Sequence, residues 1–492
     1  MAQVRLLVVA LFLTVPLYPQ TMQLSSYYGA QGTTVAAAMA TDRSGDVYTV
    51  GSTTSPGPCK DAQVTGVQNV VVVKVNVNKT LGWCTYIGNN TDYGYGIALD
   101  ASGNIYVAGM TNSPGLGTQG AFQTTLQGTY DAFVAELNSQ GQMQWFTYLG
   151  TALTSQVNSV FLDSSDAIYI TGYTTGDGWP VAGGVSQTTY GGGGFDIAIA
   201  KLNPIPCQGC QQTLAWSGYL GGNSDDVGYR MAVSPDGSEA CLDGYSKSNN
   251  YPTTQGAFQT TKNAARAAVV TCVDAALGFT KASTYFGGTS TSQLQCNTCA
   301  AGLTFDLSGN IWIVGLTQRE TNFPITANAL QPTYGGGLHD AFISELTTDL
   351  STTSLLYSTW FGGGGDDGAV APEFDPSGNL WIHGNTFSDN LPLYGNSFQT
   401  SNGGPAQTAD SFLLELSPSG NNSWIGAYST YLGGSANEFG GATQSLAVGP
   451  GVIWFTGYTE SSDFPLVNPF DKEQRGPESG FVAQFCPSCL AK

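Results

Sequence analysis

Two aspartate doublets, Asp225-Asp226 and Asp366-Asp367, are the first candidates for chemistry in this chain. Each doublet follows a glycine-rich stretch and begins six residues after an aromatic residue that recurs along the chain. The same offset carries a side-chain oxygen in seven copies, at Thr33, Asp92, Thr154, Asp225, Thr291, Asp366 and Asn437. Oxygen ligands in such loops suit a divalent cation, above all calcium, whereas side-chain oxygens also stabilise turns in the absence of metal. The sequence leaves both interpretations open for Asp225, Asp226, Asp366 and Asp367.

Aromatic residues followed by proline are the second candidates. The series of apolar-proline pairs comprises Trp179-Pro180, Tyr251-Pro252, Phe323-Pro324, Leu391-Pro392 and Phe464-Pro465. Aromatic rings beside small polar side chains bind carbohydrate or peptide, because a rigid ring offers a large contact area at low entropic cost. Trp179, Tyr251, Phe323 and Phe464 are therefore candidate ligand-binding residues. The alternative is that they pack between repeat units.

Catalytic residues are hard to identify in this sequence. The two histidines, His339 and His383, have no nucleophile motif beside them, which favours structural roles. Glycoside hydrolysis needs two converging carboxyl groups. Candidates for such a pair are Asp225, Asp226, Asp366, Asp367 and Glu438. Nothing in the spacing selects two of them, so no catalytic residue is assigned.

Ten cysteines require a separate interpretation: Cys59, Cys84, Cys207, Cys210, Cys241, Cys272, Cys296, Cys299, Cys486 and Cys489. Three Cys-x-x-Cys pairs occur, but they follow different strands of the repeat and cannot share one zinc ion. The βαβ context that a thioredoxin-like redox site would need is absent. No Cys-x-x-Cys pair is followed by the histidine that haem attachment would need. We expect disulfides within the three close pairs, between Cys241 and Cys272 and between Cys59 and Cys84.

The elements that position these residues are repeated seven times. An aromatic residue followed two positions later by glycine recurs from Tyr27/Gly29 to Tyr431/Gly433. Downstream comes a turn and an apolar strand that ends in glycine, as in Asp100–Gly109, with a hydroxyl residue two positions after the glycine. An alternating strand follows, often opened by aspartate, as in Asp131–Leu137. Each unit therefore contains four short strands, and seven such units predict an all-β, seven-bladed β-propeller.

The repeated turns have a structural explanation. In the Asp-x-Ser-Gly-Asn turn, glycine supplies the positive φ that the hairpin needs, and Asp or Asn caps backbone groups. Asp42-Arg-Ser-Gly-Asp46 also resembles a calcium loop, but it offers too few oxygens for the six to eight ligands that calcium takes. The hydroxyl after the strand-ending glycine is expected to satisfy backbone groups.

The two ends of the chain are expected to complete one blade. The last unit contains three strands, the third at Phe481–Phe485, and the chain begins with an isolated fourth strand at Leu24–Tyr28. We predict that these two strands pair. This pairing closes the ring and removes an open sheet edge.

These motifs resemble the bacterial beta-propeller repeat called the SBBP repeat. The best matches are Tyr219–Gly222, Asp100–Gly109, Phe323-Pro324 and Asp340–Leu346. The resemblance extends over essentially the whole chain after residue 22. It implies a single seven-bladed propeller over residues 23–492, usually exported, with no common activity. Asp166, in place of the turn glycine, and the turn at Ser234–Gly244 depart from the pattern.

Composition and charge narrow the function. The net charge of −20, with 15 basic and 35 acidic residues, argues against nucleic acid and anionic lipid as partners. Leu6–Val15 follows Arg5 and has the length of a signal-peptide core, so residues 1–22 are interpreted as a signal peptide, with a buried strand as the alternative. We expect a secreted or cell-surface protein. It is expected to need no cofactor unless calcium binds.

The function that these observations favour is a non-enzymatic scaffold that binds a protein or glycan through its loop face. A carbohydrate-active hydrolase or lyase using carboxylates at the central channel is the alternative. A purely structural role in an extracellular assembly is the third. Propellers host all three kinds of function.

Overall fold

The computed structural model describes residues 21–29, 31–57, 64–205, 210–292, 296–441 and 444–487. The expected signal peptide, residues 1–22, lies almost wholly outside these ranges. Within them the secondary structure is entirely β, and no helix long and apolar enough to span a membrane occurs.

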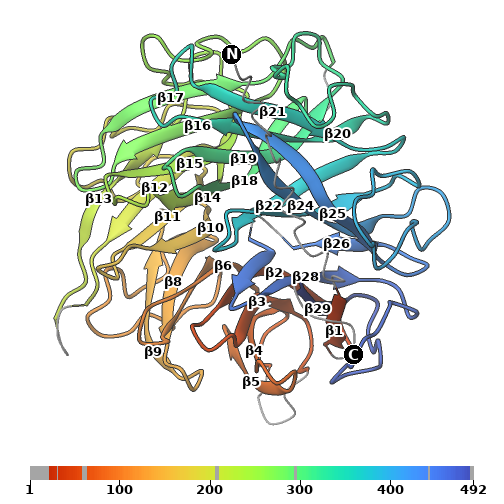
Figure 1. The fold of residues 1–492 in the computed structure, drawn as a ribbon. Helices are drawn as coiled ribbons and strands as arrows, with labels where there is room; N and C mark the ends of the chain where they lie inside the picture. Colours follow the sequence, from red (N-terminus) through yellow and green to blue (C-terminus); the bar gives the residue numbers. More distant parts are fainter. Residues whose placement is uncertain are drawn as a thin grey trace, which may run out of the picture.

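Seven antiparallel sheets radiate from one centre and form a seven-bladed propeller (Figure 1). Blades 1 to 3 contain, in chain order from the innermost strand outward, β2 (Thr34–Thr41), β3 (Val47–Thr53), β4 (Asn69–Val75) and β5 (Leu81–Ile87); β6 (Asp92–Leu99), β7 (Ile105–Thr111), β8 (Asp131–Leu137) and β9 (Met143–Leu149); and β10 (Ser155–Leu162), β11 (Ile168–Thr174), β12 (Asp196–Leu202) and β13 (Leu214–Leu220).

Blades 4 to 6 repeat this order. Their strands are β14 (Asp226–Val233), β15 (Glu239–Ser246), β16 (Ala267–Asp274) and β17 (Thr280–Phe286); β18 (Thr298–Phe305), β19 (Ile311–Gln318), β20 (His339–Leu346) and β21 (Leu355–Phe361); and β22 (Asp367–Phe374), β23 (Leu380–Thr386), β24 (Asp410–Gly420) and β25 (Ser423–Leu432).

Blade 7 is built from both ends of the chain. Its strands are β26 (Glu438–Gly440), β27 (Leu446–Gly449), β28 (Val452–Thr459), β29 (Ser479–Cys486) and β1 (Thr21–Tyr28). β1 pairs with β29 in antiparallel register, with Tyr27 opposite Phe481 and Ser25 opposite Ala483, which confirms the predicted closure. The first strand of this blade is in two pieces, because β26 and β27 pair separately with β28.

A recurring bulge explains the glycine that ends each second strand. In blade 1 the register of β2 on β3 shifts between Ala36 and Ala38. The bulge brings a carbonyl so close that a Cβ at Gly51 would lie 1.9 Å from the Val35 oxygen. The corresponding glycines of the other blades meet the same obstacle, namely Gly109, Gly172, Gly244, Gly315, Gly384 and Gly457. Only glycine tolerates this approach.

The turns between first and second strands confirm the capping interpretation. Asp42 Oδ1 accepts the backbone N–H groups of Ser44 and Asp46, at 2.9 and 3.0 Å. The turns that begin at Asp100, Asp163, Asp306 and Asp375 repeat this pair of bonds. Asp166, which stands where the other turns have glycine, adopts φ 62° and keeps the turn.

Apolar packing lies between the blades. Seven main clusters of buried side chains each join two neighbouring blades; one, for example, combines Trp216 of blade 3 with Met231 and Tyr285 of blade 4. Since the last cluster joins blade 7 to blade 1 through Leu24 and Met39, the core is continuous around the ring.

Candidate functional site

The inner aspartate of each doublet is a buried cap. Asp226 and Asp367 begin the first strands of blades 4 and 6 and are 0 % and 2 % exposed. Asp226 Oδ2 accepts the N–H of Gly222 and the hydroxyl of Ser248, both at 2.7 Å. Asp367 is held in the same way by Gly363 and Ser388. Both carboxyl groups therefore stabilise the connection between two blades.

The outer aspartates face the loops. Asp225 pairs with Lys247 at 2.8 Å and accepts the N–H of Gly194 at 2.9 Å. Burial opposes ionisation of Asp225, but the bonds from Lys247 and Gly194 and the charges of Lys247 and Arg266 together outweigh it and lower the pKa of this carboxyl group. Asp366 accepts the N–H of Leu338 at 2.5 Å. The two members of a doublet thus have separate partners, which favours turn stabilisation over a shared calcium ion.

Metal-ligand clusters do not support a cation site at the doublets either. Among the residues that the structure describes, the one group of three candidate ligand atoms within 4.8 Å of one another is Glu239, Cys241 and Cys272. The two cysteines of this group form a disulfide, so their sulfur atoms are not thiolate ligands.

Carboxyl groups meet across blade boundaries instead. The aspartate that opens a third strand lies near the acidic residue that opens the first strand of the next blade. The pairs are Asp196 with Asp226, Asp340 with Asp367, and Asp410 with Glu438. Burial raises the pKa of Asp196, Asp340, Asp410 and Glu438 to about 7, and the neighbouring acid adds to the rise for each of the three aspartates. The anchor glycine lies between the members of a pair, since a Cβ at Gly362 would lie 2.7 Å from an oxygen of both Asp340 and Asp367.

The aromatic residues before proline are buried, which agrees with packing between repeat units and not with an open ligand-binding face. Trp179, Tyr251, Phe323 and Phe464 are 2 %, 3 %, 6 % and 2 % exposed. Each belongs to one of the apolar clusters that join neighbouring blades. Their rings are therefore not available to a ligand in this conformation.

The anchor tyrosine fixes the loop that carries such a residue. Tyr285 donates its hydroxyl to the Ser248 carbonyl at 2.6 Å and accepts the N–H of Tyr251 at 3.1 Å. Tyr27, Tyr148 and Tyr431 make the same two bonds in their own blades. In blade 5 the anchor is Trp360, whose buried indole N–H has no hydrogen-bond partner among the residues that the structure describes. The anchors thus hold the long loops against the outer strands.

A different set of aromatic rings is half-buried at the inner strand ends on the loop face. We call Tyr93, Tyr95, Tyr173, Phe195, Tyr229 and Tyr245 the tyrosine patch; all but the buried Tyr245 are partly exposed. Tyr93 and Tyr95 lie parallel at 6.1 Å, Tyr173 meets Phe195 at 4.8 Å, and Tyr229 meets Tyr245 at 5.9 Å between ring centroids. These residues come from blades 2, 3 and 4, so neighbouring blades build one surface.

The tyrosine patch is supported by one cation. The Arg266 guanidinium lies 4.0 Å from the centroid of the Tyr245 ring, a cation–π contact. Burial raises the pKa of Tyr95, Tyr173 and Tyr229, so their hydroxyl groups are neutral at physiological pH. The patch offers aromatic surface together with neutral hydroxyl groups.

Sequence reasoning missed the tyrosine patch, although a signal was present. Tyr173 and Tyr245 occupy the middle position of the Gly-x-Ser/Thr step, and Tyr93 follows the first residue of β6. The step was explained by its glycine and hydroxyl alone. In several blades the hydroxyl does what was expected: Thr111 accepts the Ser113 N–H at 2.9 Å and Ser246 accepts the Ser248 N–H at 3.0 Å. Thr174 instead bonds the Ser155 hydroxyl at 3.2 Å.

The histidines have structural environments. His383 is buried, and its Nδ1 lies 2.8 Å from Ser445 Oγ. Burial lowers the pKa of His383 to about 3, so the ring is neutral. His339 is half-buried, with Nε2 3.1 Å from the Cys296 carbonyl and Nδ1 3.6 Å from Asp366.

Two disulfides lie fully within the described residues. Cys241 and Cys272 are directly opposite each other in β15 and β16 and are bonded. Cys296 and Cys299 are bonded at the start of β18. Cys84, Cys210 and Cys486 are also disulfide-bonded. The partners expected for them, Cys59, Cys207 and Cys489, lie outside the described residues.

Seven four-stranded antiparallel blades, closed by strands from both chain ends, define a β-propeller. A sequence profile of the SBBP beta-propeller repeat matches residues 23–58, 82–115 and 144–178. The chain is therefore a seven-bladed β-propeller that carries SBBP repeats.

Comparison with solved structures finds chains that are similar at low sequence identity. A chain of the mitotic checkpoint complex is 12 % identical, with a TM-score of 0.46 and coverage of 92 % of this chain and 94 % of that one. The periplasmic gluconolactonase PpgL of Pseudomonas aeruginosa is 9 % identical, with a TM-score of 0.43 and coverage of 92 % and 98 %. A Dyadobacter fermentans protein described as of unknown function is 9 % identical, with a TM-score of 0.43 and coverage of 96 % and 100 %. No curated protein matches the chain significantly in sequence.

Proposed function

We propose that this protein is an exported, non-enzymatic scaffold that binds a glycan or protein partner on its loop face. The observation that carries the proposal is the tyrosine patch, which three blades build from partly exposed rings. Tyrosine combines a large apolar surface with a hydroxyl group and has few rotamers to lose, so it is favoured in binding surfaces. Arg266 adds a cation against the ring of Tyr245.

The burial and hydrogen bonds of the candidate catalytic carboxyl groups support binding rather than hydrolysis. A hydrolase would need one carboxyl group as acid and another as base or nucleophile, both facing substrate. Asp226, Asp367 and Glu438 are buried and accept hydrogen bonds from the connection that precedes their own strand. Asp225 is occupied by Lys247. These groups are therefore committed to the fold.

Export is supported by the disulfides. Cys241–Cys272 and Cys296–Cys299 are bonds of a kind that persists outside the reducing cytoplasm. The proposed signal peptide at residues 1–22 and the low content of charged residues, 10 %, fit the same location.

The test is a binding screen of the purified protein against soluble polysaccharides by affinity electrophoresis, followed by analysis of the retained polysaccharide for cleavage. We expect retardation by one glycan class without release of reducing ends. Tyr93→Ala and Tyr173→Ala should weaken this retardation at least tenfold, whereas Leu277→Ala, which truncates an exposed side chain on the opposite face, should not. If no glycan binds, a protein partner captured through the same tyrosines is required. Cleavage of the polysaccharide would contradict the proposal.

A further inference from the structure

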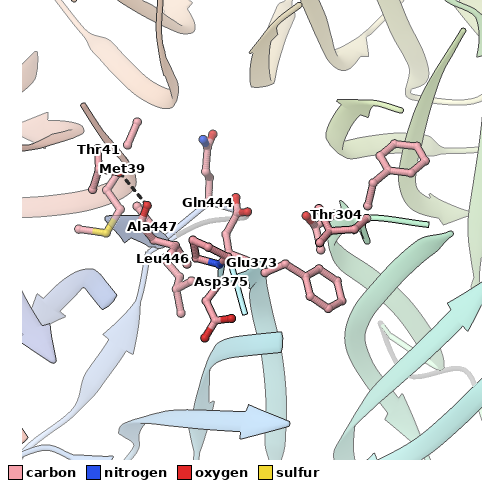
Figure 2. A pocket seen from close by; sticks show the side chains of 14 residues that line it. Met39, Thr41, Thr304, Glu373, Asp375, Gln444, Leu446 and Ala447 are labelled. Atoms are coloured by element: carbon pink, nitrogen blue, oxygen red, sulfur yellow. Dashed lines mark hydrogen bonds between the residues drawn. The ribbon is translucent and has the colours of Figure 1, made fainter. Parts of the chain in front are cut away.

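A cavity of about 470 Å³ opens at the end of the central channel opposite the tyrosine patch. It lies where the first strands of blades 1, 5, 6 and 7 reach their turns. Figure 2 shows Glu373, Gln444 and Leu446 on one side and Thr304 across the open space from them. The volume is in the range of sites for small molecules.

The split first strand of blade 7 shapes this cavity. Gln444 precedes β27 and bonds to blade 1. Its carbonyl accepts the N–H of Met39 in β2 at 2.8 Å. Ala38 and Gln444 form a parallel bridge between blades 1 and 7. As a result, an amide side chain stands at the channel in one blade.

The residue at the position of Glu373 can be compared among the seven blades. Glu373 is the penultimate residue of β22, the first strand of blade 6, and lies opposite Trp381 of β23. The matching residues of the other blades carry no charge: Ala40, Ala98, Phe161, Ala232, Thr304 and Ala447. The fold of a blade therefore does not by itself require a carboxylate at this position.

Glu373 is held in place by an arginine from another blade. Arg230 Nη2 of β14 lies 2.7 Å from Glu373 Oε1, and the Arg230 backbone N–H donates to Asp243 Oδ1 at 2.9 Å. The Arg230 side chain is 5 % exposed and that of Glu373 is 28 % exposed. No second described residue hydrogen-bonds the Glu373 carboxylate. One of its oxygens therefore remains available at the cavity.

The described lining of the cavity supplies acceptors and aromatic carbon, and the cation beside it, Arg230, is already paired with Glu373. The lining contains the carboxylates of Glu373 and Asp375, the amide of Gln444 and the hydroxyl groups of Thr41 and Thr304, with no Lys, Arg or His. The Thr41 hydroxyl already donates to the Val448 carbonyl at 3.0 Å, so it can only accept from a ligand. Phe305 and Phe374 are half-buried and supply ring carbon.

We propose that this cavity binds a small organic cation, an amine or guanidinium group on an apolar body, through Glu373. The charge pairs with the free carboxylate oxygen and with the Gln444 carbonyl, and the body packs against Phe305 and Phe374, whose faces also attract cations. The net charge of −20 raises the local concentration of such ligands. This site is separate from the tyrosine patch and does not depend on the function proposed for it.

The test compares two ligands of the same shape, benzylamine and benzyl alcohol, by calorimetric titration and by the thermal midpoint of the whole protein. Benzylamine should raise the midpoint with increasing concentration, as a ligand of the native state does, and benzyl alcohol should not. Glu373→Gln should weaken benzylamine binding at least tenfold. Glu473→Gln, which neutralises an exposed carboxylate elsewhere, is the matched control and should leave binding unchanged.

A second pair of variants covers the case in which Glu373→Gln fails to fold because Arg230 loses its partner. Gln444→Leu and Thr304→Val leave the ion pair intact and should each weaken benzylamine binding three- to tenfold. Tyr93→Ala should have no effect on this binding. Equal affinity for the alcohol, unchanged affinity in all three cavity variants, or absence of benzylamine binding would each overturn the proposal.

Discussion

Asp410 and Glu438 approach each other across Gly433, at the boundary between blades 6 and 7. A Cβ at Gly433 would lie 2.2 Å from Asp410 Oδ1 and 2.4 Å from Glu438 Oε2. Gly433→Ala should therefore lower the free energy of unfolding by about 3 kcal/mol or more, because two buried groups must move. Chemical denaturation measures this loss.

The control for this glycine is Gly368, near the start of β22. Its backbone does not have a positive φ, and a Cβ there would lie 3.5 Å from the nearest atoms, an ordinary contact. Gly368→Ala should change the free energy of unfolding by less than about 1 kcal/mol. Equal losses in the two variants would refute the steric explanation of the anchor glycine.

The same carboxyl pairs predict how stability depends on pH. The pKa values of Asp410 and Glu438 are about 7 in the folded protein, against ordinary values of 3.8 and 4.5. Between about pH 4 and pH 7 the folded state therefore binds more protons than the unfolded state, so the contribution of these groups to stability falls as pH rises and levels off above pH 7. The thermal midpoint should be higher at pH 5 than at pH 8.

Asp410→Asn tests the origin of this dependence. The variant removes one ionisable group of the pair and keeps its shape, so the decline in midpoint from pH 5 to pH 8 should become smaller. Asp349→Asn, whose pKa is lowered first by the bond from Thr347, should not reduce the decline. A wild-type midpoint that rises over this range would be inconsistent with protonated carboxyl pairs.

The hydroxyl of an anchor tyrosine should stabilise its blade. Tyr431 accepts the Leu391 N–H at 2.7 Å and donates to the Ser388 carbonyl at 2.9 Å. Tyr431→Phe leaves both buried backbone groups without this partner and should lower the free energy of unfolding by about 1–3 kcal/mol. Tyr394→Phe, at a half-buried tyrosine outside the anchor positions, should cost less than about 0.5 kcal/mol. Urea denaturation of the two variants compares them directly.

The two described disulfides should differ in their effect on stability. Cys241 and Cys272 are 31 residues apart, whereas Cys296 and Cys299 are 3 apart. A longer closed loop restricts the unfolded chain more, so replacing Cys241 and Cys272 with alanine should cost about 2–4 kcal/mol and replacing Cys296 and Cys299 less. A larger loss from the short pair would show that local structure around β18 dominates instead.

Repetition made the fold predictable, and departures from repetition made the sites difficult to predict. The blade order and the pairing of β1 with β29 followed from the recurring anchors and the incomplete last unit. The glycine of the aromatic anchor was recognised as a marker, but the sequence did not show that it separates Asp410 from Glu438, because these residues come from different units.

The candidate site depended on contacts that no local pattern records. The sequence left open whether the rings before proline bind a ligand or pack between repeat units, and in the structure Trp179 and Phe464 fill the space between blades. The tyrosine patch forms because β6, β11, β14, β15 and the residue before β12 bring variable positions of three blades together. Arg230 and Glu373 are 143 residues apart, and only the closed ring places them in contact.

The most direct test of the binding proposal is hydroxyl-radical footprinting of the protein with and without its retained partner. We predict protection of Tyr93, Tyr95 and Tyr173 on the loop face. Exposed side chains on the opposite face, Leu277 and Leu307, should react equally in both samples. Protection of Leu277 and Leu307 with unchanged reactivity of the three tyrosines would contradict the account.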